Sequence, residues 1–150
     1  MLENLLEKSL ALSLENAVTN TANNITVFED RGFICVIRLT SMGHLCGYVA
    51  TPNTHKINNV TYEYSHNIPL DCHGGITFNE EDSKHGITLL GFDCAHGFDY
   101  SPSMKMGDPA NYRDVEYVSI ELKRMVDQLL EIDSATLTSL DTIKQLMLEE

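Results

Sequence analysis

The spacing of apolar and polar residues along the chain predicts helices at both ends of the sequence and strands between them. Apolar residues recur at helical spacing over residues 1–18 and again over 134–150. The strongest pattern covers 112–132, where the apolar positions are three or four residues apart and charged residues lie between them (Val115, Val118, Leu122, Met125, Val126 and Leu129). One face of that helix is therefore expected to be buried.

The middle of the chain, residues 25–111, has the pattern of short strands joined by polar loops. The runs rich in β-branched and aromatic residues are 25–29, 33–39, 44–50, 60–64, 76–79 and 87–90. The first two runs are joined by the compact turn at 30–32 and the last two by the polar segment 80–86, and both connectors favour antiparallel hairpins. The sequence therefore predicts one α+β domain over 1–150: a mostly antiparallel sheet packed against the helix at 112–132, with additional N- and C-terminal helices.

The last two strands are expected to form a hairpin around the polar segment 80–86. If Asn79 faces Ile87, each step outward pairs one residue of the first strand with one of the second, and His73 falls opposite Asp93. A shift in this pairing changes which side chains meet, so the prediction depends on the register.

Two polar clusters lie at the outer ends of this hairpin, residues 71–75 (Asp-Cys-His-Gly-Gly) and 91–96 (Gly-Phe-Asp-Cys-Ala-His). Within them, His73, Asp93 and His96 can transfer protons, and they are our candidate catalytic residues. The same three side chains are also candidate ligands of a metal ion, with zinc as the first choice.

Three interpretations of these clusters remain open: a metal site, a metal-free acid–base pair and a purely structural role. In the metal site, Cys94 is a weaker candidate ligand than Asp93, because adjacent residues of a strand point to opposite faces. Without a metal, an aspartate could orient a histidine for proton transfer, with a thiol such as Cys46 or Cys94 as nucleophile. In the third interpretation these side chains only brace the turns of the fold.

Other residues could contribute contacts to a ligand bound beside these clusters. The candidates are Cys46, Tyr48, His55, Gly74, Gly75, Tyr112 and Arg113. The two glycines leave backbone accessible to a ligand. Tyr112 and Arg113 open the main predicted helix, whose first N–H groups attract anions, and the arginine could add a charge-assisted contact.

The charge of the chain bounds its partners. Asp and Glu number 22 against 10 Lys and Arg, which gives a net charge of −12 and argues against direct binding to nucleic acid. No apolar run approaches the ~20 residues that span a bilayer, and no basic export segment is evident, so we expect a cytoplasmic protein without a membrane span. The sequence contains no phosphate-binding Gly-rich loop and no HExxH or GxSxG motif.

The order of several motifs resembles a family of small proteins encoded by bacteriophages, prophages and plasmids. The motifs are Cys-Gly-Tyr-Val at 46–49, His-Gly-Gly-Ile-Thr at 73–77, Gly-Phe-Asp-Cys-Ala-His at 91–96 and Tyr-Arg-Asp at 112–114. The resemblance covers about residues 44–128 and implies a setting in a bacterial host rather than a mechanism. The family pattern continues with Gly-Asp, whereas this chain has Phe98 between Gly97 and Asp99, so the resemblance assigns no role to Asp99.

These observations lead to one functional hypothesis and two alternatives. The resemblance implies a phage or mobile-element accessory protein, and the polar clusters suggest a pocket that binds or hydrolyses a small nucleotide-like ligand, in opposition to host defence. One alternative is an acidic inhibitor that binds a host or phage protein and has no catalytic activity. The other is a metal-dependent hydrolase.

Overall fold

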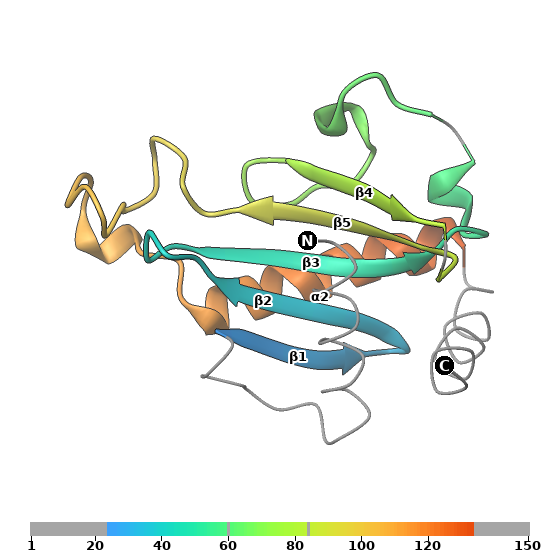
Figure 1. Cartoon of the computed structure of the whole chain (residues 1–150), viewed down its shortest axis with the longest axis horizontal. Coiled ribbons are helices and arrows are strands. Elements are labelled where there is room, and N and C mark those ends of the chain that lie inside the picture. Colours follow the sequence, from blue (N-terminus) through green and yellow to red (C-terminus); the bar gives the residue numbers. More distant parts are fainter. Residues whose placement is uncertain (1–23, 60, 84, 134–150) are drawn as a thin grey trace.

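The computed structural model describes residues 24–59, 61–83 and 85–133. They form a five-stranded antiparallel sheet with one long helix, α2, against one of its faces (Figure 1). The strand order is β1-β2-β3-β5-β4, and the elements are β1 (Ile25–Asp30), β2 (Phe33–Leu39), β3 (Leu45–Pro52), β4 (Phe78–Asp82), β5 (Ile87–Asp93) and α2 (Val115–Ile132). The predicted α+β class is confirmed, while the helices expected over 1–18 and 134–150 lie outside the described residues.

The turn between β1 and β2 shows how local sequence fixes the sheet against the helix. Arg31 and Gly32 both have positive φ, 47° and 91°, as the two-residue turns that match the twist of a hairpin require. The guanidinium of Arg31 then donates hydrogen bonds to Asp127 and to the backbone carbonyl of Lys123 on α2. The hairpin tip is thereby tied to the helix.

The main core lies between the sheet and α2. Alternate residues of β2, among them Phe33, Cys35 and Ile37, pack with Val118 and Leu122 of the helix. Burying each large apolar side chain contributes roughly 1.5–3 kcal/mol. The residues of β2 that point the other way, such as Ile34 and Val36, belong to a second buried cluster, so this strand is apolar on both faces.

α2 begins later than the pattern at 112–132 predicted. Its N-cap is Asp114, whose carboxylate accepts a hydrogen bond from the backbone N–H of Tyr117. Tyr112 and Arg113 therefore precede the helix in an extended segment, and the expectation that they open it is wrong. This change leaves the Arg113 side chain available to the loop after β5.

The predicted register of the last hairpin is also wrong. Asn79 pairs with Leu90 and Asp82 pairs with Ile87, so the strands are shifted by three residues from the expected pairing. The reason is that β4 is an edge strand and tolerates polar residues, which had suggested a loop. Asp93 lies opposite Cys46 of β3 rather than opposite His73.

The segment between β3 and β4 differs from expectation as well. Residues 61–64 form no strand, and the chain instead makes two short 3₁₀ turns, η2 (Lys56–Asn58) and η3 (Ser65–Asn67). Figure 1 shows this segment beyond the β4 edge of the sheet. No helix among the described residues is long and apolar enough to cross a membrane.

Candidate functional site

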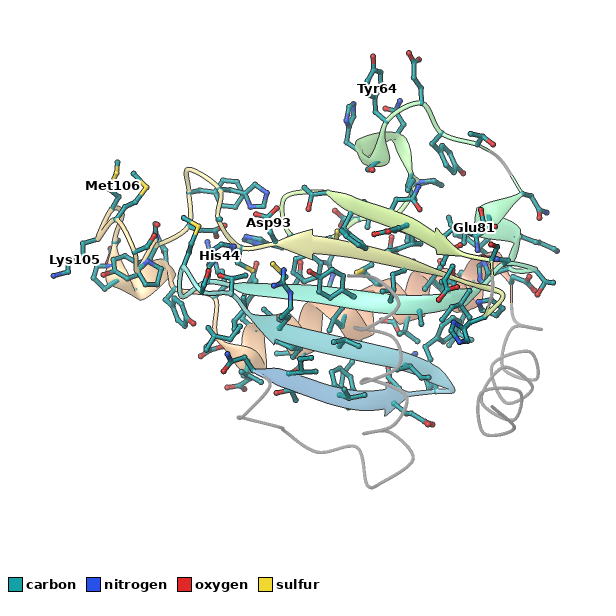
Figure 2. All side chains as sticks on the ribbon, viewed as in Figure 1. His44, Tyr64, Glu81, Asp93, Lys105 and Met106 are labelled. Carbon is teal, nitrogen blue, oxygen red and sulfur yellow. The ribbon has the colours of Figure 1, made fainter. Side chains whose placement is uncertain are left out.

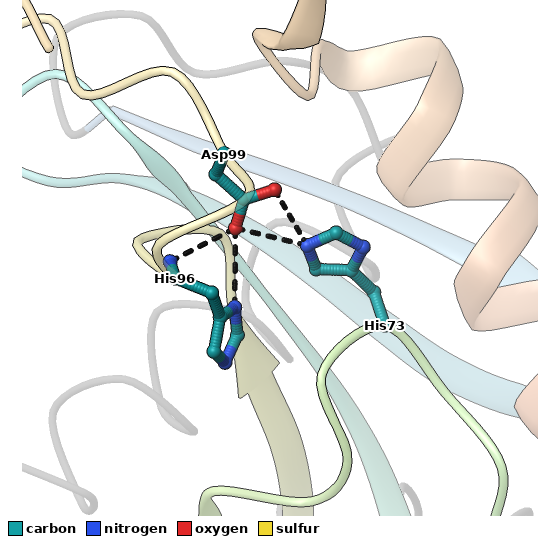
Figure 3. A group of neighbouring side chains, drawn as sticks. All are labelled: His73, His96 and Asp99. Carbon is teal, nitrogen blue, oxygen red and sulfur yellow. Dashed lines mark hydrogen bonds and ion pairs between the residues drawn. The ribbon is translucent and has the colours of Figure 1, made fainter. Parts of the chain in front are cut away.

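Two histidines and a buried aspartate meet at one end of the sheet, where β5 ends and β3 begins (Figure 3). His73 comes from the segment that leads into β4, and His96 and Asp99 come from the loop that follows β5. The corrected register explains the meeting of the two histidines: continued beyond the strands, it places residue 73 opposite residue 96. Their ring centroids are 5.4 Å apart.

Asp99 is the centre of this group. Its Oδ1 lies 2.9 Å from His73 Nε2 and accepts a 2.9 Å hydrogen bond from Arg113 Nε. Its Oδ2 accepts hydrogen bonds from the backbone N–H of His96 at 2.9 Å and from His96 Nδ1 at 3.1 Å, and lies 3.0 Å from His73 Nε2. The residue is only 4% exposed, so these N–H groups replace the water that the carboxylate would otherwise bind.

These contacts keep Asp99 ionised. Burial by itself would raise the pKa of the carboxyl, but the hydrogen bonds from His73, Arg113 and His96 outweigh it and lower the pKa from 3.8 to about 2. Hydrogen bonding to Asp99 in turn raises the pKa of Arg113. The buried charge is therefore paired, as a stable buried carboxylate requires.

An ionised Asp99 fixes the proton positions on His73. Nε2 must carry the proton that Asp99 accepts, so in the neutral ring Nδ1 accepts the hydrogen bond from the Tyr117 hydroxyl, 2.7 Å away. The guanidinium carbon of Arg113 lies 5.0 Å from the centroid of the Tyr117 ring, within cation–π distance. Tyr117, His73 and Asp99 thus form a continuous hydrogen-bonded chain.

Phe98 has a structural role in the turn that joins His96 to Asp99. The backbone N–H of Asp99 donates to the carbonyl of His96, which closes a four-residue turn with Gly97 and Phe98 at its centre. Phe98 and Gly97 therefore provide the three-residue spacing through which Asp99 bonds His96. The Phe98 ring stacks on the His96 ring at 5.1 Å and is 55% exposed.

Gly74 explains why His96 can lie so close to the segment of His73. Gly74 has a φ of +70°, and a Cβ there would lie 2.3 Å from His96 Cε1. No residue with a side chain fits at that distance. Gly75 also has positive φ, +80°, but a Cβ there would have no heavy atom within 4 Å.

Asp93 lies at the margin of the site. Its Oδ1 is 3.8 Å from His96 Nε2, and its carboxylate accepts hydrogen bonds from Thr77 Oγ1 and from the backbone N–H of Ala95. The Asp93 side chain is 33% exposed and that of His96 21%, whereas the side chains of His73 and Asp99 are almost fully buried. The group is therefore open to solvent on the side of Asp93 and His96.

The remaining sequence candidates make their contacts outside this group. Cys46 and Tyr48 belong to the cluster on the sheet face away from α2, where the Tyr48 hydroxyl accepts a bond from Arg38. His55 bonds the carbonyl of Leu129 on α2. Leu129 comes twelve residues after Tyr117, which corresponds to about 18 Å along the helix axis. The Tyr112 hydroxyl donates to the carbonyl of Gly43 and so braces the loop between β2 and β3.

The cysteines near the site are buried thiols. Burial, together with the charge of Asp99, raises the pKa of Cys94 to about 12, and burial with the charges of Glu121 and Asp71 raises that of Cys72 to about 12. Burial also raises the pKa of Cys46. At neutral pH these groups are protonated, and a protonated thiol is a poor nucleophile and a poor metal ligand.

His73, His96 and Asp99 form a group that could hold a metal ion, because one ligand atom from each lies within 4.8 Å of the others. Two imidazole nitrogens and a carboxylate oxygen are a donor set that zinc and other transition metals accept. The sequence-based set contained both histidines but had Asp93 in the place of Asp99. The short spacing His-x-x-Asp after a strand end was the signal available for Asp99.

Tyr117 was the second site residue without a predicted role. It lies on the first turn of α2, where the position of the N-cap Asp114 sets the direction of its side chain. A sequence pattern gives the face of a helix but not the point at which a distant loop meets it, so its partner His73 could not be inferred.

Comparison of the chain with protein-family models, with curated protein sequences and with solved structures finds no match.

Proposed function

We propose that His73, His96 and Asp99 bind a transition-metal ion such as zinc, and that the protein is a metal-dependent hydrolase of a small nucleotide-like ligand. The observation that carries the proposal is the group itself: three ligand atoms of suitable chemistry lie within 4.8 Å of one another. A site with three protein ligands leaves further positions for water and substrate, which is the arrangement of catalytic rather than structural zinc.

The neighbours of the three ligands support this assignment. Metal-bound histidines usually hydrogen-bond an outer partner through their second nitrogen, and ligating carboxylates are themselves hydrogen-bonded. Tyr117 lies 2.7 Å from Nδ1 of His73; with a metal on Nε2 the ring proton would move to Nδ1, which would then donate to the Tyr117 oxygen. Arg113 bonds Oδ1 of Asp99. Both contacts would hold the ligands in position without occupying an open coordination site.

The nucleophile in this mechanism is water, because the neighbouring cysteines are protonated thiols at neutral pH. A metal held by His73, His96 and Asp99 would lower the pKa of a bound water, and the partly exposed carboxylate of Asp93, beside His96, would accept the proton that the water releases. The water oxygen would then bond to the electrophilic centre as the bond to the leaving group breaks, and the leaving group would take a proton from solvent or from Asp93.

The surroundings of the site suggest the substrate class. Phe98 presents an exposed aromatic ring next to His96, on which a base could stack. In the phage or mobile-element setting that the sequence motifs imply, such a ligand would be a nucleotide signal of the host, and its hydrolysis in the cytoplasm would oppose host defence.

Sequestration of such a ligand without a metal is the second candidate. It is favoured by the hydrogen bonds of Asp99, whose carboxylate is paired within the chain by His73, His96 and Arg113. In that case the group would be a rigid polar surface, and His96, its most exposed member, the residue that contacts the ligand.

The test begins with the metal content of tag-free protein, measured by elemental analysis, and with zinc titration by calorimetry. We expect one zinc per chain, lost in His73→Gln and His96→Gln but kept in His66→Gln, an exposed histidine outside the group. Circular dichroism of each variant checks that it is folded. Failure of the folded wild type to bind zinc at micromolar concentration would overturn the metal assignment.

The hydrolase assignment needs a separate measurement. The zinc-loaded protein is incubated with a panel of mono-, di- and cyclic nucleotides, and the products are identified by mass spectrometry. Turnover that disappears in Asp93→Asn while zinc remains bound would support hydrolysis with Asp93 as proton acceptor. Tight ligand binding without turnover would favour sequestration instead.

A further inference from the structure

A polar pocket of about 290 Å³ lies far from the histidine group, between the segment after β3 and the strands β4 and β5. The described residues that line it include Asn53, Asn58, Tyr62, Glu81, Thr88 and Leu90. None of them belongs to the candidate metal group. Figure 2 shows Glu81 on β4, on the side of the segment that carries η2. The volume suits a small molecule, at the lower end of the ~300–1,000 Å³ of typical ligand pockets.

Two residues of the wall, Asn58 and Thr88, donate their protons within the protein and keep acceptor atoms. Asn58 donates both of its amide protons inward, to Thr51 Oγ1 and to the carbonyl of Pro52, so its oxygen is the atom it can offer a ligand. Thr88 donates its hydroxyl proton to Asn53 Oδ1 at 2.6 Å and keeps its lone pairs. A ligand that binds the Asn58 oxygen and the Thr88 hydroxyl oxygen would therefore supply N–H or O–H donors to these two residues.

The charge of the pocket points in the same direction. Glu81 contributes a carboxylate, one oxygen of which accepts a 3.4 Å bond from Asn53, and the lining residues that the structure describes include no Lys, Arg or His. The chain as a whole carries a net charge of −12. Phosphate or carboxylate ligands are therefore disfavoured here, and an ammonium group is favoured. The apolar floor, formed by Ile57, Ile68 and Leu90, suits one face of a carbon ring.

From these features we infer a second binding site, for a small organic cation that carries an amino group and several hydroxyls, such as an amino sugar. The amino group pairs with Glu81, and the hydroxyls donate to Asn58 and Thr88. The ring packs on Leu90 beside Tyr62. This site is independent of the proposed hydrolase activity, because no residue is shared between the two.

Glucosamine and glucose form the first pair of probes, because the two sugars differ only in the amino group at one carbon. Both are titrated into ¹⁵N-labelled protein near pH 6, where the amine is protonated and Glu side chains are ionised, up to about 10 mM. We expect glucosamine to shift the amide signals of Thr61, Tyr62, Thr88 and Leu90. Glucose should bind at least tenfold more weakly, because a charge-assisted hydrogen bond is stronger than a neutral one.

Two glutamates on β4 provide a matched pair of variants. Side chains alternate along a strand, so Glu81 faces the pocket while Glu80 points to the other side of the sheet. We expect Glu81→Gln to weaken glucosamine binding about tenfold and to leave glucose binding unchanged. Glu80→Gln should leave both unchanged. Glu80 and Glu81 are both exposed, so neither substitution is expected to disturb folding.

Three results would overturn the inference. The absence of shifts at the highest glucosamine concentration would refute the site. Equal binding of the two sugars, or equal effects of Glu80→Gln and Glu81→Gln, would refute the role assigned to the carboxylate. Shifts confined to the residues around His73 and His96 would place the ligand in the other site.

Discussion

Replacement of Asp99 by asparagine tests the central feature of the site, a buried carboxylate held by N–H groups from three residues. Asn has the same shape but no charge, and its amide nitrogen would face donors where the carboxylate accepts from them. The pKa of Asp99 is about 2 in the folded protein against 3.8 ordinarily, a difference that corresponds to about 2 kcal/mol of stability from its ionised form. Leaving the Arg113 charge without its partner adds to this cost, so we expect Asp99→Asn to lose about 2–4 kcal/mol.

The assay is urea unfolding at neutral pH, followed by circular dichroism, with Asp93→Asn as the matched control. Asp93 is 33% exposed and is held by Thr77 and the N–H of Ala95, so its replacement should cost less than about 1 kcal/mol. Equal losses in the two variants would contradict the assignment of Asp99 as the charged centre of the site.

The dependence on pH gives an independent check. The ionised form of Asp99 stabilises the fold fully above the pKa of an unfolded aspartate, about 3.9. That contribution shrinks as the pH falls through 3.9 towards the folded pKa of about 2 and is absent below it. The stability difference between wild type and Asp99→Asn should therefore narrow between about pH 5 and pH 2. A difference that stays constant over this range would refute the electrostatic explanation.

Three further predictions concern the surroundings of the site. Gly74→Ala and Gly75→Ala introduce similar backbone strain at positive φ, but only the first brings a Cβ against His96, so it should cost about 1 kcal/mol more in thermal unfolding and shift the His96 NMR signals. Tyr117→Phe removes the hydrogen bond to His73 and should weaken zinc binding roughly tenfold in calorimetry while the fold is kept; unchanged affinity would remove Tyr117 from the site. Alkylation of the thiols by iodoacetamide near pH 8 should be slow in the folded protein and complete in urea, because burial raises the pKa of all four cysteines (Cys35, Cys46, Cys72 and Cys94). Fast labelling of the native state would contradict this burial.

The fold class followed from the sequence because the helix has a clear hydrophobic period and most strands are short apolar runs bounded by turn residues. β2 was located with both ends correct, since Phe33–Leu39 is a continuous apolar run bounded by a Gly turn and by polar residues. The register of β4 was not, because an edge strand can be polar along its whole length. The polar residues after Asn79 suggested a loop, although they continue the strand.

The site was predicted only in part, and the wrong register of β4 is one cause. The two histidines stood out because they flank a hairpin. The three-residue error in the register of that hairpin placed Asp93 opposite His73, whereas the observed register, continued beyond the strands, places His96 there. Asp99 lies beyond the strand, in a loop whose path depends on the turn at Gly97-Phe98 and on the contact with Arg113. Such tertiary contacts have no periodic signature, so they became visible only in the folded chain.

The outer edge of β4 has a consequence for how the molecule behaves among its own copies. An edge strand presents unpaired backbone groups to which another chain can add, and natural proteins guard such edges with charge. β4 carries Glu80, Glu81 and Asp82 in succession, and the first two are exposed. At neutral pH the like charges of two approaching edges repel each other, so this strand protects the protein from joining sheet to sheet into aggregates.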